Sequence, residues 1–307
     1  MTAPSSGILV VDKIAGVTSF DAVALSRTRL GVRRIGHAGT LDPAATGVLP
    51  LLVGEATKLA PYLMDEDKEY LTTVRFGITT DTHDLVGRVL SETVVSGLTR
   101  EALEIACRAF VGRIRQVPPM YSAVHHAGRR LYELAREGTE VDRAPRDVVV
   151  SEIEVQTVAG SRATLRVVCG KGTYVRVLAA DLGAALGWGA AVERLVRTRV
   201  GGFALADALP WRDLAEATVA AIWARVLPLD AGLAHLREAR LDAAGARRFG
   251  HGQAADVTRP LASREFVRVY DAAGVLLGVG EVAPTGTSVR PVRVVNADRP
   301  GPSVRPA

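Results

Sequence analysis

The sequence predicts an α+β protein built from two units, and three observations lead to this fold class. Strand-like and helix-like patterns interleave along the chain without the regular strand–helix–strand rhythm of a doubly wound sheet. From about residue 236 onward, the residue pattern changes to short strand patterns separated by turn residues. The chain has 307 residues, of which 48% are of apolar types. This length and composition allow a sizeable core and about two domains.

The first elements are expected to be a strand, a helix and a loop rich in turn residues. The apolar run over residues 8–13 predicts a short buried strand, and a helix capped by Thr18 and Ser19 is expected over residues 20–30. Residues 36–50, GHAGTLDPAATGVLP, follow neither the strand period nor the helix period. We therefore expect an ordered loop there, and loops that need special backbone shapes often carry functional sites.

The central part of the chain predicts a strand, a helix and an excursion from the core. A half-buried strand is expected over residues 68–76, where alternate residues share one face. An amphipathic helix that begins after Thr99 is expected to stop at Gly112. Residues 113–147 break these patterns and carry more arginines than acidic residues. We interpret them as an excursion from the core with a short helix at residues 131–138.

The remaining elements complete the alternation of strands and helices. We expect paired strands over 148–156 and 163–169, a helix ended by Gly187, mixed helical segments over 205–235, a hairpin over 266–282, a strand near 289–295 and a frayed tail.

Positive charge is concentrated at the end of the chain. The whole sequence has 38 basic and 33 acidic side chains, and residues 236–307 hold 11 of the basic and 7 of the acidic ones. This distribution favours a C-terminal module that faces a polyanion. An ordinary basic domain without such a partner fits the charge equally well.

Several classes of protein are excluded by what the sequence lacks. No stretch approaches the roughly 18 apolar residues of a transmembrane helix, and the N-terminus does not have the pattern of a signal peptide. Cys107 and Cys169 are too few for a disulfide framework or a cysteine-based zinc site. Residues 171–173, Lys-Gly-Thr, lack the rest of a phosphate-binding loop. We expect a cytoplasmic protein that does not bind membranes.

Asp42 is the first candidate for a catalytic residue. It lies between Leu41 and Pro43 in the turn-rich loop, and the proline biases it towards an extended backbone. A carboxylate held in this way can act as a nucleophile or as a general base. The alternative is a residue that caps its own loop through an Asx turn.

His37 and residues 81–84 resemble metal ligands in type, but their spacing argues against a metal site. No second histidine has metal-ligand spacing to His37, and Asp42 would be its lone carboxylate partner. The run Asp-Thr-His-Asp at 81–84 lacks the spacing of a calcium loop, so we expect a tight turn after the strand. His37 taken alone is expected to be an exposed loop residue.

Tyr70 and Arg176 stand out by their positions. Tyr70 lies on the inner face of the strand over 68–76, where packing in the core is the default interpretation. Arg176 lies near the start of a buried helix, where its positive charge opposes the helix dipole. A buried arginine in this position needs a carboxylate partner.

Several sequence motifs occur together in one order and spacing. They are VVDKIAGVTSFDAV (10–23), GHAGTLDPAATGVLPLLVGEATKL (36–59), DKEY (67–70), TDTHD (80–84), PPMYSAVHHAGRRLYELAREG (118–138), CGKGTYVRVLAADLG (169–183) and LVRTRVGGF (195–203). Over about residues 6–235 the chain resembles the bacterial TruB-type tRNA pseudouridine synthases, which act on the uridine of the tRNA T-loop. The C-terminal part is similar, more weakly, to the small RNA-binding PUA domain, which is a β-barrel.

The resemblance implies an architecture and a partner. It implies a pseudouridine-synthase catalytic domain over residues 1–235, with a mixed, largely antiparallel sheet flanked by helices and an RNA-contacting insertion at about 113–147. A PUA-like domain is implied over residues 236–297 and a flexible tail over 298–307. The family acts on the T-arm of tRNA and needs no metal or cofactor. The chain is expected to be a monomer without an obligate protein partner.

The resemblance also implies catalytic roles. Asp42 matches the catalytic aspartate of the family. This residue attacks the substrate, and the base is detached from its ribose, rotated and rejoined through carbon. Tyr70 matches the tyrosine that stacks on the target base and lies near the proton to be removed. Arg176 matches the arginine that pairs with the aspartate, which would supply the carboxylate partner that its position requires.

Three more residues match substrate-binding positions of the family. Tyr174 and Leu195 match residues that line the uridine pocket. His37 matches the histidine that fills the gap left when the uridine flips out of the RNA.

Three other interpretations are left open by the residues alone. A tRNA-binding or RNA-folding protein would keep the scaffold without relying on catalysis, although an intact catalytic set argues against it. A glycosidase would need a second carboxylate about 5–9.5 Å from Asp42, so Asp81 or Asp84 would have to lie close to it. A guide-RNA-dependent relative of the family is disfavoured because the chain lacks long basic tails.

Overall fold

A ten-stranded sheet forms the larger part of the molecule. The computed structural model describes residues 6–122, 124–126 and 128–296. The strand order is β14-β1-β3-β12-β4-β11-β10-β7, with β2 paired to β3 and β13 paired to β12. The strands are β1 (Gly7–Lys13), β2 (Ile35–His37), β3 (Thr46–Val53), β4 (Lys68–Phe76), β7 (Gly112–Gln116), β10 (Arg146–Ala159), β11 (Arg162–Cys169), β12 (Ala190–Val200), β13 (Phe203–Ala204) and β14 (Leu209–Pro210). Two pairs, β1 with β14 and β3 with β12, are parallel, and the others described are antiparallel. The sheet is therefore mixed and largely antiparallel, as the resemblance implied.

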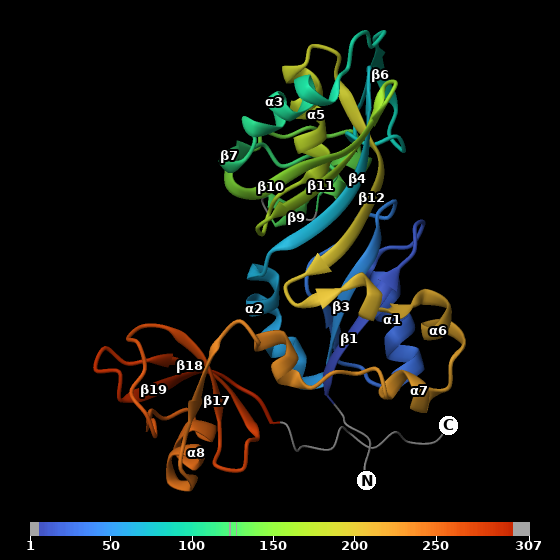
Figure 1. Ribbon diagram of the computed structural model, residues 1–307. Coiled ribbons are helices and arrows are strands. Elements are labelled where there is room, and N and C mark those ends of the chain that lie inside the picture. Colours follow the sequence, from blue (N-terminus) through green and yellow to red (C-terminus); the bar gives the residue numbers. More distant parts are fainter. Residues whose placement is uncertain (1–5, 123, 127, 297–307) are drawn as a thin grey trace.

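Helices lie beside both halves of this sheet (Figure 1). One half has α1, α6 and α7 next to β1, and the other half has α3 and α5 beside β10, β11 and β12. The helices are α1 (Ser19–Leu30), α2 (Ala60–Asp65), α3 (Arg100–Arg108), α4 (Leu131–Arg136), α5 (Val175–Ala185), α6 (Trp211–Glu216), α7 (Val219–Trp223) and α8 (Ala243–Gly250), with 3₁₀ helices η1 (Gly54–Leu59), η2 (Leu205–Asp207) and η3 (Leu229–Leu233). No helix in the described part of the chain is long and apolar enough to span a bilayer.

The long strands β4 and β12 connect the two halves of the molecule (Figure 1). They pair antiparallel, with Tyr70 opposite Arg197 and Thr72 opposite Leu195. On its other side β12 meets β3, where Arg197 lies opposite Gly47. The segment that leads into β3 therefore reaches the middle of the sheet.

The C-terminal part forms a second, five-stranded curled sheet. Its order is β15-β17-β18-β19-β16, and α8 packs on it. The strands are β15 (Arg237–Arg240), β16 (Ala255–Asp256), β17 (Phe266–Tyr270), β18 (Leu276–Val282) and β19 (Ser288–Val294). Two short hairpins, β5 (Ile78–Thr80) with β6 (Val89–Glu92) and β8 (His125–His126) with β9 (Arg129–Arg130), complete the strands.

The second sheet shares an apolar cluster with the first part of the chain. Its contribution comes from β17, β18 and the residue after β19, which pack with η1, α2 and η3. The members from the second sheet are Tyr270, Leu276, Val279 and Val295, and those facing them include Leu59, Leu63, Leu229 and Leu233. The two units are therefore joined by a buried contact.

Most predicted elements are confirmed. The strand over 68–76 has the predicted bounds and alternation, since Tyr70, Thr72 and Val74 are buried along one face of β4. The helix after Thr99 is capped by that residue's side chain, and β10 and β11 pair as expected. The hairpin over 266–282 is β17 and β18. The tail expected over 298–307 lies outside the described residues.

The loop predicted over residues 36–50 is wrong at both ends. Residues 35–37 form β2, and the segment from Thr46 belongs to β3. Seven of the eight residues of β3 are buried, because both of its faces are covered. A strand buried on both faces loses the alternation by which a half-buried strand is predicted.

Two other segments have a different secondary structure from the one predicted. The ends of the excursion over 113–147 belong to the large sheet, because β7 pairs with the start of β10 at the sheet edge. Arginines point outward along β7 and hide its strand character in the sequence. Residues 205–235 contain only short helical pieces and the strand β14, instead of continuous helices.

Candidate active site

The loop between β2 and β3 carries Asp42 and is held from several directions. The hydroxyl of Ser19, the first residue of α1, accepts from the Leu41 N–H at 2.8 Å and donates to the Leu41 carbonyl at 3.2 Å. The Gly16 N–H donates to the Pro43 carbonyl at 2.9 Å. Asp42 is thus flanked by two residues whose backbone is fixed, which gives its carboxylate a defined direction.

Arg176 grips the Asp42 carboxylate with two hydrogen bonds. Its Nε lies 2.8 Å from Asp42 Oδ2, and its Nη2 lies 3.2 Å from Asp42 Oδ1. The remaining donors reach the carbonyls of Thr82, at 2.5 Å from Nη1, and of Tyr121, at 2.9 Å from Nη2. The arginine side chain is 5% exposed and the aspartate side chain 34% exposed. A buried arginine therefore holds a carboxylate that solvent can reach, and the carboxylate partner predicted for Arg176 is Asp42.

Asp84 brings a second carboxylate to the same guanidinium. Its Oδ2 lies 3.8 Å from Arg176 Nε, while its Oδ1 accepts from the Thr82 hydroxyl at 2.6 Å. Residues 81–84 form the predicted turn after the sheet strands, and His83 adopts a left-handed backbone there with φ of 61°. Burial and the nearby Arg176 charge lower the pKa of His83.

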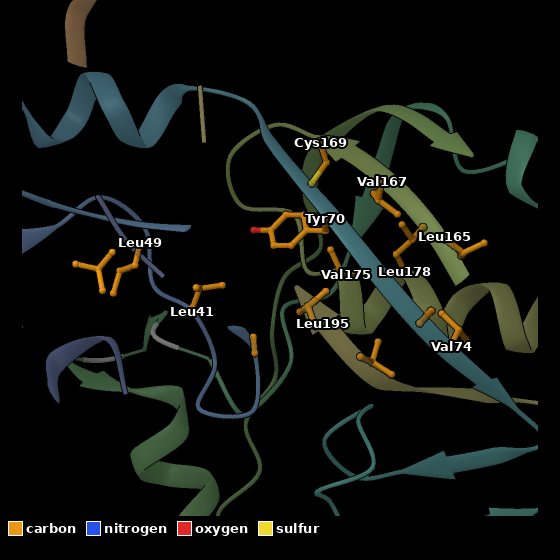
Figure 2. Packing of buried hydrophobic residues seen from close by; sticks show 14 of the residues in the cluster. Leu41, Leu49, Tyr70, Val74, Leu165, Val167, Cys169, Val175, Leu178 and Leu195 are labelled. Atoms are coloured by element: carbon orange, nitrogen blue, oxygen red, sulfur yellow. The ribbon is translucent and has the colours of Figure 1, made fainter. Parts of the chain in front are cut away.

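Tyr70 lies beside this pair on the inner face of β4. Figure 2 shows its ring pointing from the strand towards the side of Leu41 and Leu49, which bracket the Asp42 loop. The side chain is 9% exposed, and burial raises the pKa of its hydroxyl while the Arg197 charge opposes the rise. Tyr70 is therefore neutral at physiological pH.

The three residues matched to substrate binding lie on neighbouring elements. Leu195 is buried on β12 in the same apolar cluster as Tyr70. Tyr174 precedes α5, where its N–H and carbonyl both bond the Gln116 side chain, and burial raises the pKa of its hydroxyl. The Asp42 charge adds to the effect of burial and raises the pKa of both tyrosine hydroxyls. His37 ends β2 and is half-buried, where the sequence predicted an exposed loop residue.

Two buried cations near Asp42 were not predicted from the sequence. Lys13 is fully buried, and its ammonium donates to the carbonyls of Ile14 and Val17 at 2.8 Å and of Pro43 at 3.3 Å. Burial lowers the Lys13 pKa to about 8, although the Asp42 charge acts in the opposite direction. The second is Arg197, on β12. The sequence feature that could have indicated both cations is a basic residue within an apolar strand pattern.

Comparison with known families and proteins identifies the chain. Residues 27–175 match the N-terminal domain of the TruB family pseudouridylate synthases, 176–234 the tRNA pseudouridylate synthase B C-terminal domain, and 238–295 the C-terminal region of pseudouridine synthase II TruB. The chain is 45% identical to the tRNA pseudouridine synthase B of Chromohalobacter salexigens over 95% of both chains. It is also 45% identical to that of Dechloromonas aromatica, over 90% of this chain and 91% of the relative. The chain belongs to the TruB family.

Solved structures show the same fold. A crystal structure of a Cbf5-Nop10-Gar1 complex contains a chain that matches 94% of this TruB-family protein with a TM-score of 0.74 at 24% identity, over 85% of that chain. The protein is thus a pseudouridine synthase with the pseudouridine-synthase fold and a PUA-like C-terminal sheet. Family membership decides against the glycosidase, even though Asp84 lies close to the Asp42–Arg176 pair. It also disfavours a binding protein that does not rely on catalysis.

Proposed function

We propose that this TruB-family enzyme isomerises one uridine in the T-loop of tRNA to pseudouridine. The relatives named tRNA pseudouridine synthase B, which share 45% identity over nearly their whole length, support tRNA as the substrate. The observation that carries the proposal is the Asp42 carboxylate, held at 2.8 Å by Arg176 on a loop beside Tyr70. A fixed and accessible carboxylate next to an aromatic ring suits chemistry on a flipped base.

Asp42 is the nucleophile in this proposal. The Arg176 fork binds both carboxylate oxygens and aims them, as planar bidentate pairs do. The carboxylate attacks the nucleotide and the N-glycosidic bond breaks. The base then rotates, a carbon–carbon bond to the ribose replaces the carbon–nitrogen bond, and the bond to Asp42 breaks, which frees the carboxylate. The base carbon that is now bonded to the ribose loses its proton, and the ring nitrogen released from the ribose takes up a proton. The product is therefore an isomer of the substrate.

Tyr70, Tyr174 and Leu195 form the pocket for the flipped uridine. Tyr70 is neutral at physiological pH and stacks on the base near the carbon that loses its proton. Stacking on an aromatic ring returns about 1–3 kcal/mol per base, which offsets the cost of leaving the RNA stack. His37, at the end of β2, fills the gap that the uridine leaves in the T-loop.

The two units divide the work. Residues 1–235 form the catalytic domain, with the RNA-contacting insertion at about 113–147, and residues 236–297 form the PUA-like domain, which meets the phosphates of the T-arm. The separate second sheet and its excess of arginine support this division. The enzyme acts as a monomer in the cytoplasm, where its tRNA substrate is found.

An assay with unmodified tRNA tests the substrate. The protein is incubated with a tRNA transcript and with a matched transcript whose T-loop uridine is replaced by cytidine, and pseudouridine is mapped at each position. We expect a single pseudouridine in the T-loop of the first transcript and none in the second. Pseudouridine at other positions, or none in either RNA, would overturn the assignment.

A further inference from the structure

Arg197 is a buried cation that the proposed reaction does not use. It is 1% exposed and lies on β12 between Tyr70 of β4 and Gly47 of β3. None of the ion pairs found among the described residues involves it. A buried guanidinium without a carboxylate is costly unless its N–H groups find other acceptors. The groups that accept from Arg197 therefore indicate why the charge is there.

The acceptors lie on both sides of Asp42. Arg197 Nε donates to the Val48 carbonyl at 2.7 Å, after the catalytic candidate in sequence. Its Nη2 donates to the Gly39 carbonyl at 3.1 Å, and its Nη1 points to the Thr40 carbonyl at 3.4 Å, both before it. One rigid guanidinium thus ties the incoming and outgoing arms of the Asp42 loop together.

The backbone of Arg197 fixes the same loop a second time. Gly47 has a φ of +102°, and a Cβ there would lie 2.2 Å from the Arg197 carbonyl oxygen. No other residue type can approach β12 so closely at this point. The loop is therefore anchored to Arg197 through both its main chain and its side chain.

Arg197 also lies opposite Tyr70 in the pairing of β12 with β4. The Arg197 charge lowers the pKa of the Tyr70 hydroxyl and so opposes the effect of burial, which raises it. Arg197 therefore donates to carbonyls on both sides of Asp42 while it pairs across the sheet with the residue that carries the tyrosine hydroxyl.

We propose that Arg197 is a positioning residue that sets the distance between Asp42 and Tyr70. The proposal rests on the roles given above to these two residues. It adds that one residue holds the Asp42 loop through its side chain and Tyr70 through the pairing of β12 with β4, and that this residue does not itself touch the substrate. A displacement of about 1 Å in such a site costs on the order of 100-fold in rate.

The test compares Arg197→Met and Arg197→Lys with Arg194→Met in the full-length enzyme. Arg194 lies exposed on the same strand, so its variant removes the same charge without touching the loop. Thermal unfolding and circular dichroism are measured first, followed by tRNA affinity and the single-turnover rate at saturating tRNA. We expect Arg197→Met to bind tRNA within about threefold of wild type while its single-turnover rate falls on the order of 100-fold. Arg197→Lys should recover part of the rate, and Arg194→Met should keep all of it.

Each other outcome overturns the proposal. Folded Arg197 variants with the wild-type single-turnover rate would show that the loop keeps its geometry without the guanidinium. Failure of both variants to fold would show that Arg197 serves the whole sheet and not the site. Asp42→Asn is assayed in parallel: if it stays active the proposed function itself fails, whereas an inactive Asp42→Asn beside fully active Arg197 variants removes only the positioning role.

Discussion

At the scale of single residues, the Asp42–Arg176 pair joins segments 134 positions apart in the sequence. The arginine donates two hydrogen bonds to the carboxylate and two to backbone carbonyls, so it both orients Asp42 and is itself held in place. A lysine carries the charge but lacks the planar fork.

We therefore predict that Arg176→Lys slows the chemical step and spares binding. Losing a charge-assisted hydrogen bond costs about 1.5–3 kcal/mol, which corresponds to a roughly tenfold to 100-fold lower rate. Single-turnover kinetics at saturating tRNA measure the rate, and filter binding measures affinity. A weakened affinity with an unchanged rate would mean that Arg176 holds the RNA instead of orienting Asp42.

Lys13 gives a prediction on stability. Its pKa of about 8 in the folded protein lies below the ordinary value of 10.5, so between these pH values the unfolded chain binds the proton that the folded chain has lost. The free energy of unfolding of the wild type should then rise with pH across this window, by up to about 1.4 kcal/mol per pH unit relative to Lys13→Met. Urea unfolding of both proteins from pH 7 to 10 measures the difference. Parallel curves would contradict the low pKa.

The interaction partners of the residues around Asp42 could be predicted from the sequence to different extents. The position of Arg176 in a buried helix demanded a carboxylate, but only the family resemblance identified Asp42 as that partner. Lys13 and Arg197 could not be found in this way, because their partners are backbone carbonyls. Carbonyls are the same in every residue, so the sequence does not show which of them a buried cation will find.

At the scale of elements, the position of α5 determines where Arg176 lies. The helix packs on β12, and Gly183 is the point of closest approach, where a Cβ would lie 2.2 Å from the Ala190 nitrogen. The glycine is needed for space, since both partners at this contact are backbone.

Gly183→Ala should therefore push α5 away from β12 and destabilise the protein by about 1–3 kcal/mol, as overpacking does. Activity should fall as well, because Arg176 moves with its helix. Gly202→Ala is the matched control, since a Cβ at that position meets nothing within 4 Å. Equal thermal stabilities of the two variants would show that the helix–strand contact yields easily.

Strands that were not predicted from the sequence lack a regular alternation of buried and exposed residues. The pairing of β12 with β4 has register shifts between Val192 and Arg194 and between Arg197 and Arg199, and each extra residue reverses the inward and outward faces. Strand β3 is buried on both faces. Strand β4 has one regular buried face and shows the full alternation over 68–76.

At the scale of the whole molecule, the C-terminal sheet is fastened to the catalytic part by polar as well as apolar contacts. The Lys58 ammonium donates to the Val294 carbonyl at 3.0 Å, and the Tyr270 hydroxyl donates to Asp230 at 2.8 Å. Removing residues 236–307 would expose this seam. The role of the C-terminal charge is therefore better tested in the full-length chain.

Replacing Arg247, Arg259 and Arg264 by glutamine should weaken tRNA binding. All three are exposed on the C-terminal unit. Each arginine that contacts a phosphate should reduce the slope of log affinity against log salt by about 0.7–0.9, while the rate at saturating tRNA stays unchanged. Salt titrations of binding compare this variant with Arg212→Gln, an exposed arginine on α6. Identical slopes for the triple variant and the wild type would exclude these arginines as phosphate contacts.

We propose that Asp42 performs the chemistry in the site that Arg176 and Tyr70 complete. The most direct test of this proposal is Asp42→Asn, which keeps the size of the side chain and removes its charge and nucleophilicity. The measurement is pseudouridine formed in unmodified tRNA under single-turnover conditions, with deamidation excluded by mass spectrometry. We predict tRNA binding close to that of the wild type and no pseudouridine. Turnover by the intact asparagine protein would exclude Asp42 as the nucleophile.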